Sequence, residues 1–151
     1  MICGIDPGLT GGISFIHGVD IVASRVPVTS VGGKKFLNLV EIIKLLDLYK
    51  PTMVFIEKQQ SMPNQGVAST FKTGFNYGIY IGLFTALGIA YAEVSPRKWK
   101  QELEVPADKN LARDKASELM PQAANSWLLK CEDGVAESAM IAYWGIHRSL
   151  Y

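Results

Sequence analysis

Two acidic side chains stand directly after apolar runs that have the composition of buried strands. Asp6 follows the run at residues 1–5, and Glu57 follows the run at residues 52–56. If these strands are neighbours in a sheet, both carboxylates lie at the edge where open α/β sheets bind ligands. Carboxylates so close repel each other unless one is protonated or a cation bridges them, and Mg²⁺ prefers such oxygen ligands. Taken singly, Asp6 could equally cap an Asp-Pro-Gly turn, and Glu57 could be a solvated strand end.

A second pair of acids lies near the end of the sequence. Asp133 and Glu137 are four residues apart, so on a helix they lie ~40° apart around the axis and share one face. Like charges at this spacing destabilise an isolated helix, which favours a cation between them. Glu132 lies off that face, and we expect it to point to solvent ahead of the helix. Asp133 could instead be only an N-cap.

The acids need elements that bring them together, and the hydrophobic pattern predicts such elements. Three antiparallel strands come first, and strands then alternate with helices, which predicts an α/β fold with a mixed five-stranded sheet, an antiparallel hairpin plus parallel strands, and helices on both faces. No repeat or linker interrupts residues 1–151, so we expect a single domain. The predicted strands cover residues 1–6, 12–16, 20–26, 52–56 and 89–94, the predicted helices 36–49, 66–88, 108–120 and 134–150, and a flexible loop 32–35.

Composition narrows the function classes. The chain has 151 residues, of which 48% are hydrophobic and 19% charged, so it is globular rather than disordered. The net charge of +1 excludes a strongly basic binder, although residues 58–100 carry five basic side chains against Glu93 alone and could bind a polyanion. Cys3 and Cys131 make no disulfide framework, and Cys3 fits a buried apolar position. The sequence start lacks a signal-peptide pattern, so we expect a cytoplasmic protein.

Residues 73–92 carry no charge and are long enough to cross a bilayer. Gly74, Gly78 and Gly82, here called the glycine stripe, recur at every fourth position, as in membrane helix pairs. Polar and aromatic residues dilute the hydrophobicity, and Gly88 is placed to end the helix. We therefore predict a buried helix that uses the glycine stripe for close packing, and no membrane span.

Several motifs recur in the order found in one known family. Gly4 to Gly12 is similar to that family's opening motif, and Ser95 to Lys100 resembles its Pro-x-x-Val-Lys segment, with Lys100 and Lys109 at its two basic positions. Together with the acids, these motifs resemble the RNase H-like superfamily and, within it, the RuvC family of Holliday junction resolvases, over nearly the whole length. The family's pattern of Asn followed by Ser-x-x-Lys-x-Gly-x-x-x-Gly is matched by Asn64, Ser69, Lys72, Gly74 and Gly78.

The sequence departs from the family pattern at three places. Gly134 stands where the family's penultimate acid is usual, with Asp133 one residue earlier, and Glu137 stands where Asp is commoner. The family's aromatic wedge after the second acid is replaced by residues 59–62, Gln-Gln-Ser-Met. Either the protein does not unstack bases, or Met62, Phe71 or Phe75 does so instead.

The resemblance implies a Mg²⁺-dependent, structure-selective endonuclease that cuts Holliday junctions and other branched DNA by two-metal phosphodiester hydrolysis. It implies two Mg²⁺ ions per active site, for which Mn²⁺ can substitute, held by Asp6, Glu57, Asp133 and Glu137. A four-way junction suggests a homodimer, for which the helix at residues 73–88 is a candidate contact. Each expected phosphate contact could equally be part of a solvated basic face: Lys72, Lys98, Lys100, Lys109 and Arg113.

Two other function classes remain open, and two are disfavoured. The opening motif also resembles the phosphate loop of actin-like proteins and sugar kinases, but 151 residues cannot hold their second domain, so we expect no nucleotide cofactor. A non-catalytic binder of branched DNA and an RNA-processing nuclease of the same fold would carry the same motifs. Ser-His-Asp hydrolysis is disfavoured, because the only histidines are His17 and His147, in a predicted turn and in the last helix.

Overall fold

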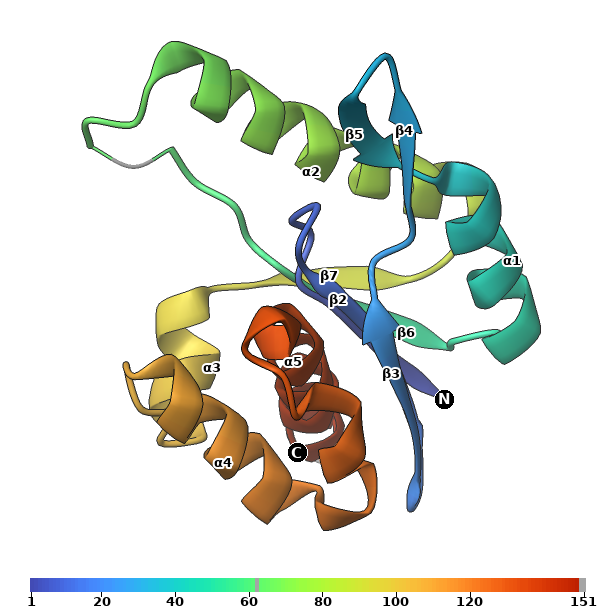
Figure 1. Ribbon diagram of the computed structural model, residues 1–151. Coiled ribbons are helices and arrows are strands. Elements are labelled where there is room, and N and C mark those ends of the chain that lie inside the picture. The colour runs from blue at the N-terminus through green and yellow to red at the C-terminus, as the bar shows by residue number, and fades with distance from the viewer. Residues whose placement is uncertain (62, 150–151) are drawn as a thin grey trace.

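The computed structural model describes residues 1–61 and 63–149, and its centre is a mixed five-stranded sheet (Figure 1). The strands lie in the order β3-β2-β1-β6-β7. β1 is antiparallel to β2 and parallel to β6, and β7 adds to β6 in parallel. The mixed sheet predicted from the sequence is therefore confirmed. Its strands are β1 Ile2–Ile5, β2 Gly12–His17, β3 Asp20–Arg25, β6 Met53–Glu57 and β7 Tyr91–Val94.

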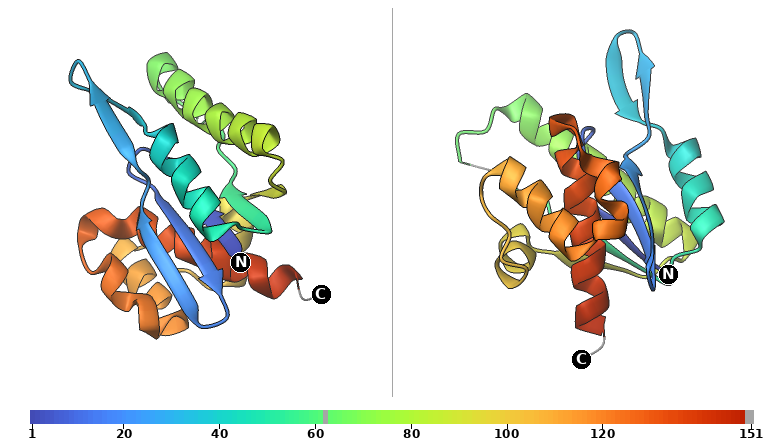
Figure 2. Two further views of the ribbon diagram at one scale, coloured as in Figure 1. Left: turned by 90° about the vertical axis from the view of Figure 1, so that its right-hand side faces the viewer. Right: turned by 60° about the horizontal axis from the view of Figure 1, so that its bottom comes forward.

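Helices cover both faces of this sheet, as Figure 2 shows from two further sides. α1 (Leu39–Tyr49) and α2 (Val67–Leu87) lie on one face, where a core cluster includes Tyr80 and Phe84. The other face packs a second cluster, which includes Trp99. The elements on that side are α3 Pro96–Glu102, α4 Lys109–Leu119, the 3₁₀ helices η1 Pro121–Trp127 and η2 Lys130–Glu132, and α5 Asp133–Ser149.

α5 lies unusually close to β1 and β2 because small residues face each other there. A Cβ added to Gly12 would lie 2.6 Å from both Ser138 Oγ and Val135 Cα, so only glycine fits. The hydroxyls of Ser14 and Ser138 are 2.5 Å apart, and Ser138 donates to the Val135 carbonyl at 2.8 Å. This packing fixes the first turns of α5 over the end of β1.

The segment between β3 and α1 differs from the prediction. Residues 32–35 are not one flexible loop: β4 (Val28–Val31) and β5 (Lys34–Leu37) form a separate two-stranded hairpin, and only Gly32 and Gly33 form its turn. Gly32 and Gly33 have φ values of 56° and 76°, the left-handed conformations that a two-residue hairpin turn requires. α1 therefore begins at Leu39, after the N-cap Asn38, and not at residue 36.

The prediction for α2 was wrong in one respect. The helix is there, but the glycine stripe is exposed, and a Cβ added to any of its glycines would meet no described atom within 4 Å. The buried face is the opposite one, formed by Asn76, Tyr80 and Phe84. Large side chains gain more from burial than glycine does, so they take the side that faces the sheet. Within the part of the chain that the structure describes, no helix is long and apolar enough to cross a membrane.

Candidate active site

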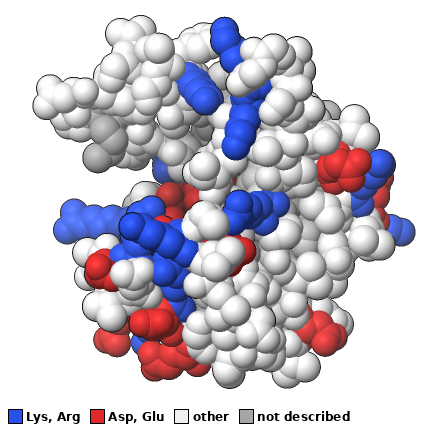
Figure 3. All heavy atoms as spheres, in the orientation of Figure 1, with Lys and Arg blue, Asp and Glu red and all other residues white. Residues whose placement is uncertain are grey.

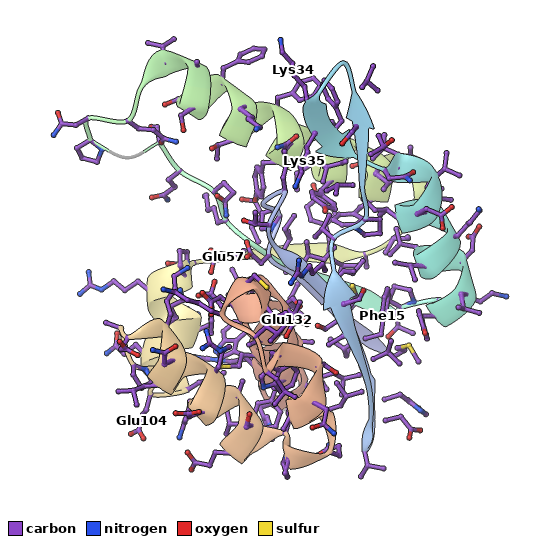
Figure 4. The ribbon with its side chains drawn as sticks, viewed as in Figure 1. Phe15, Lys34, Lys35, Glu57, Glu104 and Glu132 are labelled. Atoms are coloured by element: carbon purple, nitrogen blue, oxygen red, sulfur yellow. The ribbon has the colours of Figure 1, made fainter. Side chains whose placement is uncertain are left out.

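The ends of β1 and β6 bring the first two acids together, as the sequence predicts. The two strands are parallel neighbours with Ile5 opposite Ile56, so Asp6 and Glu57 leave the sheet side by side. Figure 4 shows Glu57 where the carboxyl end of β6 meets the helices of the second face. The Asp6 N–H donates to the Gly12 carbonyl at 3.1 Å, which fixes the turn that carries the carboxylate.

Glu137 supplies a third carboxylate from the second turn of α5. The pKa of Asp6 is raised to about 7, mainly by burial and to a lesser extent by the negative charges of Glu137 and Glu57. The Gly8 backbone N–H and the Lys100 ammonium oppose this shift of the pKa. Asp6 therefore holds a proton at a higher pH than an ordinary aspartate does, unless a cation offsets the neighbouring charges.

Glu57 is the most buried of the acids, with 9% of its surface exposed. Burial raises its pKa, and a hydrogen bond from the indole of Trp99 at 2.8 Å opposes that rise; Glu137 raises the pKa and Lys100 lowers it. Trp99 is itself fully buried in α3. It therefore fixes the Glu57 carboxylate and favours its charged form.

Lys100 links the basic segment to the acids. Its Nζ lies 3.0 Å from Oε1 of Glu137 and 5.1 Å from the centre of the Trp99 ring. A cation thus already lies among the three carboxylates. Because the contact is only partly exposed, it is stronger than an ion pair on the open surface.

Asp133 and Glu132 have different surroundings. Asp133 shares a pocket with Glu137, as helical spacing predicts, but it also contacts Arg113 Nη1, and Lys109 Nζ lies 3.5 Å away. Glu132 ends η2, where its carboxylate accepts a 2.8 Å hydrogen bond from the Leu129 N–H. Glu132 lies ahead of α5 as expected, but the expectation that it points to solvent was wrong, because this backbone bond folds it back.

The pocket between these acids has a volume of about 200 Å³ and is lined by Asp6, Asp133 and Glu137. Water occupies about 30 Å³ per molecule, so the space suits a hydrated divalent cation, and three carboxylates are the ligands that Mg²⁺ prefers. Among the described residues, no three Asp, Glu, His or Cys side chains are arranged to hold a metal ion. The carboxylate ligands present nevertheless suit Mg²⁺. Lys100 and Arg113 now pair with Glu137 and Asp133, so these two basic side chains must move before an ion can bind.

Close packing around Gly134 explains why position 134 carries no acid. A Cβ there would lie 2.6 Å from both the Thr10 carbonyl oxygen and Gly11 Cα. Gly11 and Gly134 also form an isolated parallel bridge. The loop after β1 therefore excludes any side chain at position 134, and the nearest acid on α5 is Asp133.

Basic side chains surround the acids. Figure 3 shows Lys and Arg gathered on both sides of a hollow, with acidic atoms between them. Lys72 lines a pocket beside the turn at residues 7–10, and Lys98 lies 5.9 Å from the centre of the Trp144 ring. Lys109 and Arg113 reach the site from α4 through Asp133. Four of the five predicted phosphate-binding side chains therefore lie at the pocket or its neighbour, whereas Lys98 lies against Trp144, further along α5.

Two residues near the acids were not found by the sequence argument. Trp99 was missed because the sequence analysis did not predict α3. The position of an aromatic residue within a basic segment could have indicated it. Tyr80 is fully buried on α2. Burial raises the pKa of its hydroxyl, and the negative charge of Asp6 raises it further. Of the side chains considered for base unstacking, Phe71 and Phe75 are exposed on α2. Met62 lies outside the described residues.

Comparison with known proteins supports the fold. No family model and no curated protein sequence matches the chain. Among solved structures, RuvC of T. thermophilus in complex with a Holliday junction substrate has a TM-score of 0.66 at 15% identity, over 99% of this chain and 94% of that one. The Fowlpox virus resolvase in complex with Holliday junction DNA has a TM-score of 0.53 at 19% identity, over 99% of both chains.

A third similar structure is the yeast mitochondrial Holliday junction resolvase Ydc2, with a TM-score of 0.55 at 14% identity. It is matched over 99% of this chain and 80% of that one. Strand order, the helices on both faces and these three likenesses agree with one another. The chain therefore has the RNase H-like fold of the RuvC-like Holliday junction resolvases.

Proposed function

We propose that the protein is a divalent-metal-dependent endonuclease that cuts Holliday junctions and other branched DNA. One observation carries the proposal: Asp6, Glu57 and Glu137 converge from two strands and a helix, closely enough that Glu137 and Glu57 raise the pKa of Asp6. Solved structures with this fold include two that hold Holliday junction DNA. Buried carboxylates at a sheet edge, ringed by basic residues, suit hydrolysis of a phosphodiester better than binding alone.

The acids would hold two Mg²⁺ ions, for which Mn²⁺ can substitute, with Asp6, Glu57, Asp133 and Glu137 as ligands. Such ions supply an activated water and stabilise the leaving oxygen. The protein's own residues prepare the site. Asp6 must lose its proton, because a carboxylate binds metal in its ionised form. Trp99 holds Glu57 in position.

The basic residues would exchange partners when substrate binds. Lys100 and Arg113 now neutralise Glu137 and Asp133. A cation that takes over this role frees both side chains for the phosphates that flank the cut. Contacts of this kind position the DNA and carry no sequence information. The full set of proposed phosphate contacts is Lys72, Lys98, Lys100, Lys109 and Arg113.

A twofold dimer fits the two strands that a four-way junction presents for cutting. The glycine stripe on α2 supports this surface as the contact, because it is exposed and open to close approach. Analytical ultracentrifugation at micromolar concentration should show a dimer. A monomer both with and without junction DNA would contradict the symmetric two-cut arrangement.

The test of the proposed function is cleavage of a synthetic four-way junction beside a linear duplex and an RNA hairpin of the same sequence. With Mg²⁺, we expect paired cuts in the junction, little cutting of the duplex, and none in EDTA. Binding without cleavage in Mg²⁺ or Mn²⁺ would support a non-catalytic junction binder instead. Preferential cutting of the RNA would support an RNA-processing nuclease.

A further inference from the structure

A groove separates the β4–β5 hairpin from α2, outside the acid-lined pocket. Its volume is about 720 Å³, within the size range of sites that hold small ligands. Lys34, Lys35 and Phe36 line it from the hairpin, and Phe71, Lys72 and Phe75 line it from α2. In Figure 4, Lys34 and Lys35 lie between the hairpin and α2. We call this the hairpin groove.

The aromatic residues of the hairpin groove are exposed. Phe71 is 72% exposed, Phe75 51% and Phe36 41%, although their burial would be favourable. The Phe71 and Phe75 rings lie nearly parallel, with centroids 6.1 Å apart and planes 19° apart. Exposed aromatic rings beside basic side chains are the platforms on which single-stranded nucleic acids stack their bases.

The charge of the hairpin groove is of one sign. Its three lysines form no ion pair with a described residue, and no Asp or Glu is among the described residues that line it. This distinguishes Lys34, Lys35 and Lys72 from Lys100 and Lys109, which already pair with acids of the pocket. Alternating aromatic and unpaired basic side chains match a chain of bases and phosphates.

The hairpin itself lacks a packing partner. All four residues of β4 are exposed, and in β5 only Leu37 is buried. The hairpin is fixed at its base by a 2.9 Å hydrogen bond from the Asn38 N–H to the Pro27 carbonyl. An isolated two-stranded hairpin is marginally stable in water, so a ligand seated against α2 would stabilise it.

The groove is continuous with the acid-lined pocket. Thr10 lines both spaces, and Leu9 lines the groove and the smaller pocket beside Lys72. A strand that places a phosphate at Asp6 would therefore need only to cross the turn at residues 7–10 to enter the groove. We infer that the hairpin groove binds unpaired nucleotides of the strand to be cut, with bases on Phe71 and Phe75 and phosphates at the lysines. This inference rests on the proposed function and names the part of its substrate that enters the groove.

The test measures binding without cleavage, in EDTA, by fluorescence anisotropy of a labelled oligothymidylate of about 12 nucleotides. We expect Phe71→Ala to weaken binding by roughly 5- to 140-fold, which converts from 1–3 kcal/mol per stacked base. Lys35→Ala should make the salt dependence shallower by about 0.7 per lost phosphate contact. Phe36→Ala should weaken binding from the hairpin side.

Two variants at the C-terminal end of α1 serve as matched controls and should bind like the wild type. Leu48→Ala removes a side chain that is 69% exposed. Lys50→Asn removes one positive charge at a position with φ 42°, which asparagine tolerates. Groove variants that bind the oligothymidylate as tightly as these controls would overturn the inference, and a change in oligomeric state alone would assign the groove to a contact between copies.

The proposed function can fail separately. If the wild type cuts no junction but the groove variants lose single-strand binding, the groove is a single-strand binding site and the nuclease proposal fails. If the wild type cuts junctions and the groove variants bind and cut normally, the nuclease proposal holds and the inference does not.

Discussion

The indole N–H of Trp99 donates a 2.8 Å hydrogen bond to the Glu57 carboxylate, and both residues are buried. The bond joins α3, which follows the last strand, to the end of a central strand. It opposes the rise in the pKa of Glu57 that burial causes. The carboxylate is thus kept available for a cation in a place where burial alone would favour its protonated form.

Replacing Trp99 with Phe keeps the aromatic packing and removes the hydrogen bond. The pKa of Glu57 should rise further, so cleavage should fall about 10- to 100-fold near neutral pH, as for lost partners of metal ligands, and recover at higher pH. Trp127→Phe is the matched control, because buried Trp127 donates a 3.0 Å bond to Ser117. Identical pH–rate profiles for the two variants would remove Trp99 from the site.

The raised pKa of Asp6 makes stability depend on pH. Because the pKa is about 7 in the folded protein and 3.8 as the reference value, the folded state binds more protons between these limits, and stability falls as pH rises through that window. Asparagine cannot ionise, so the Asp6→Asn variant should not lose this stability. In EDTA, the Tm of Asp6→Asn minus the Tm of the wild type should therefore increase by about 5 °C from pH 5 to pH 8. Thermal unfolding measures this difference in Tm. A difference that does not change with pH would contradict the raised pKa of Asp6.

The acids on α5 can be ranked by cleavage against Mg²⁺ concentration. Glu137→Gln and Asp133→Asn should lose activity and need more Mg²⁺, because each removes a proposed ligand. Glu132→Gln should behave like the wild type, since its carboxylate is bonded to the Leu129 N–H and lies off the site. An inactive Glu132→Gln together with an active Asp133→Asn would move the site to the start of α5.

Gly134→Ala should destabilise the protein, because its Cβ would lie 2.6 Å from the Thr10 carbonyl. Overpacking of this kind costs about 1–3 kcal/mol, which lowers the Tm by several degrees. Gly66→Ala is the control: its Cβ meets no described atom within 4 Å, and its φ of −61° is open to alanine. Equal Tm values for the two variants would show that α5 packs more loosely.

Much of the fold and part of the site could be predicted from the sequence, for physical reasons. Uninterrupted apolar runs define buried strands, and the first charge after each run marks its end, so the neighbouring positions of Asp6 and Glu57 followed once β1 and β6 were adjacent. Helical spacing placed Asp133 and Glu137 on one face. These are local patterns, and local patterns are visible in a sequence.

What could not be predicted depends on contacts between distant segments. The bond from Trp99 to Glu57 spans 42 residues and needs a short helix whose start, Ser95-Pro96, was seen only as part of a basic segment. The β4–β5 hairpin was missed because its strands are short and mostly exposed, and their apolar residues do not alternate with polar ones. The exposed glycine stripe was misassigned because small residues pack closely only where a partner faces them.

The most direct test of the central claim is the single-turnover rate of four-way junction cleavage in Mg²⁺ for Asp6→Asn, Glu57→Gln and the control Asp114→Asn. Asp114 is an exposed acid on α4. The account predicts a loss of at least about 100-fold for the first two variants, with junction binding retained in EDTA and wild-type cleavage by the control. Cleavage by Asp6→Asn or Glu57→Gln at a rate near that of the wild type would contradict it.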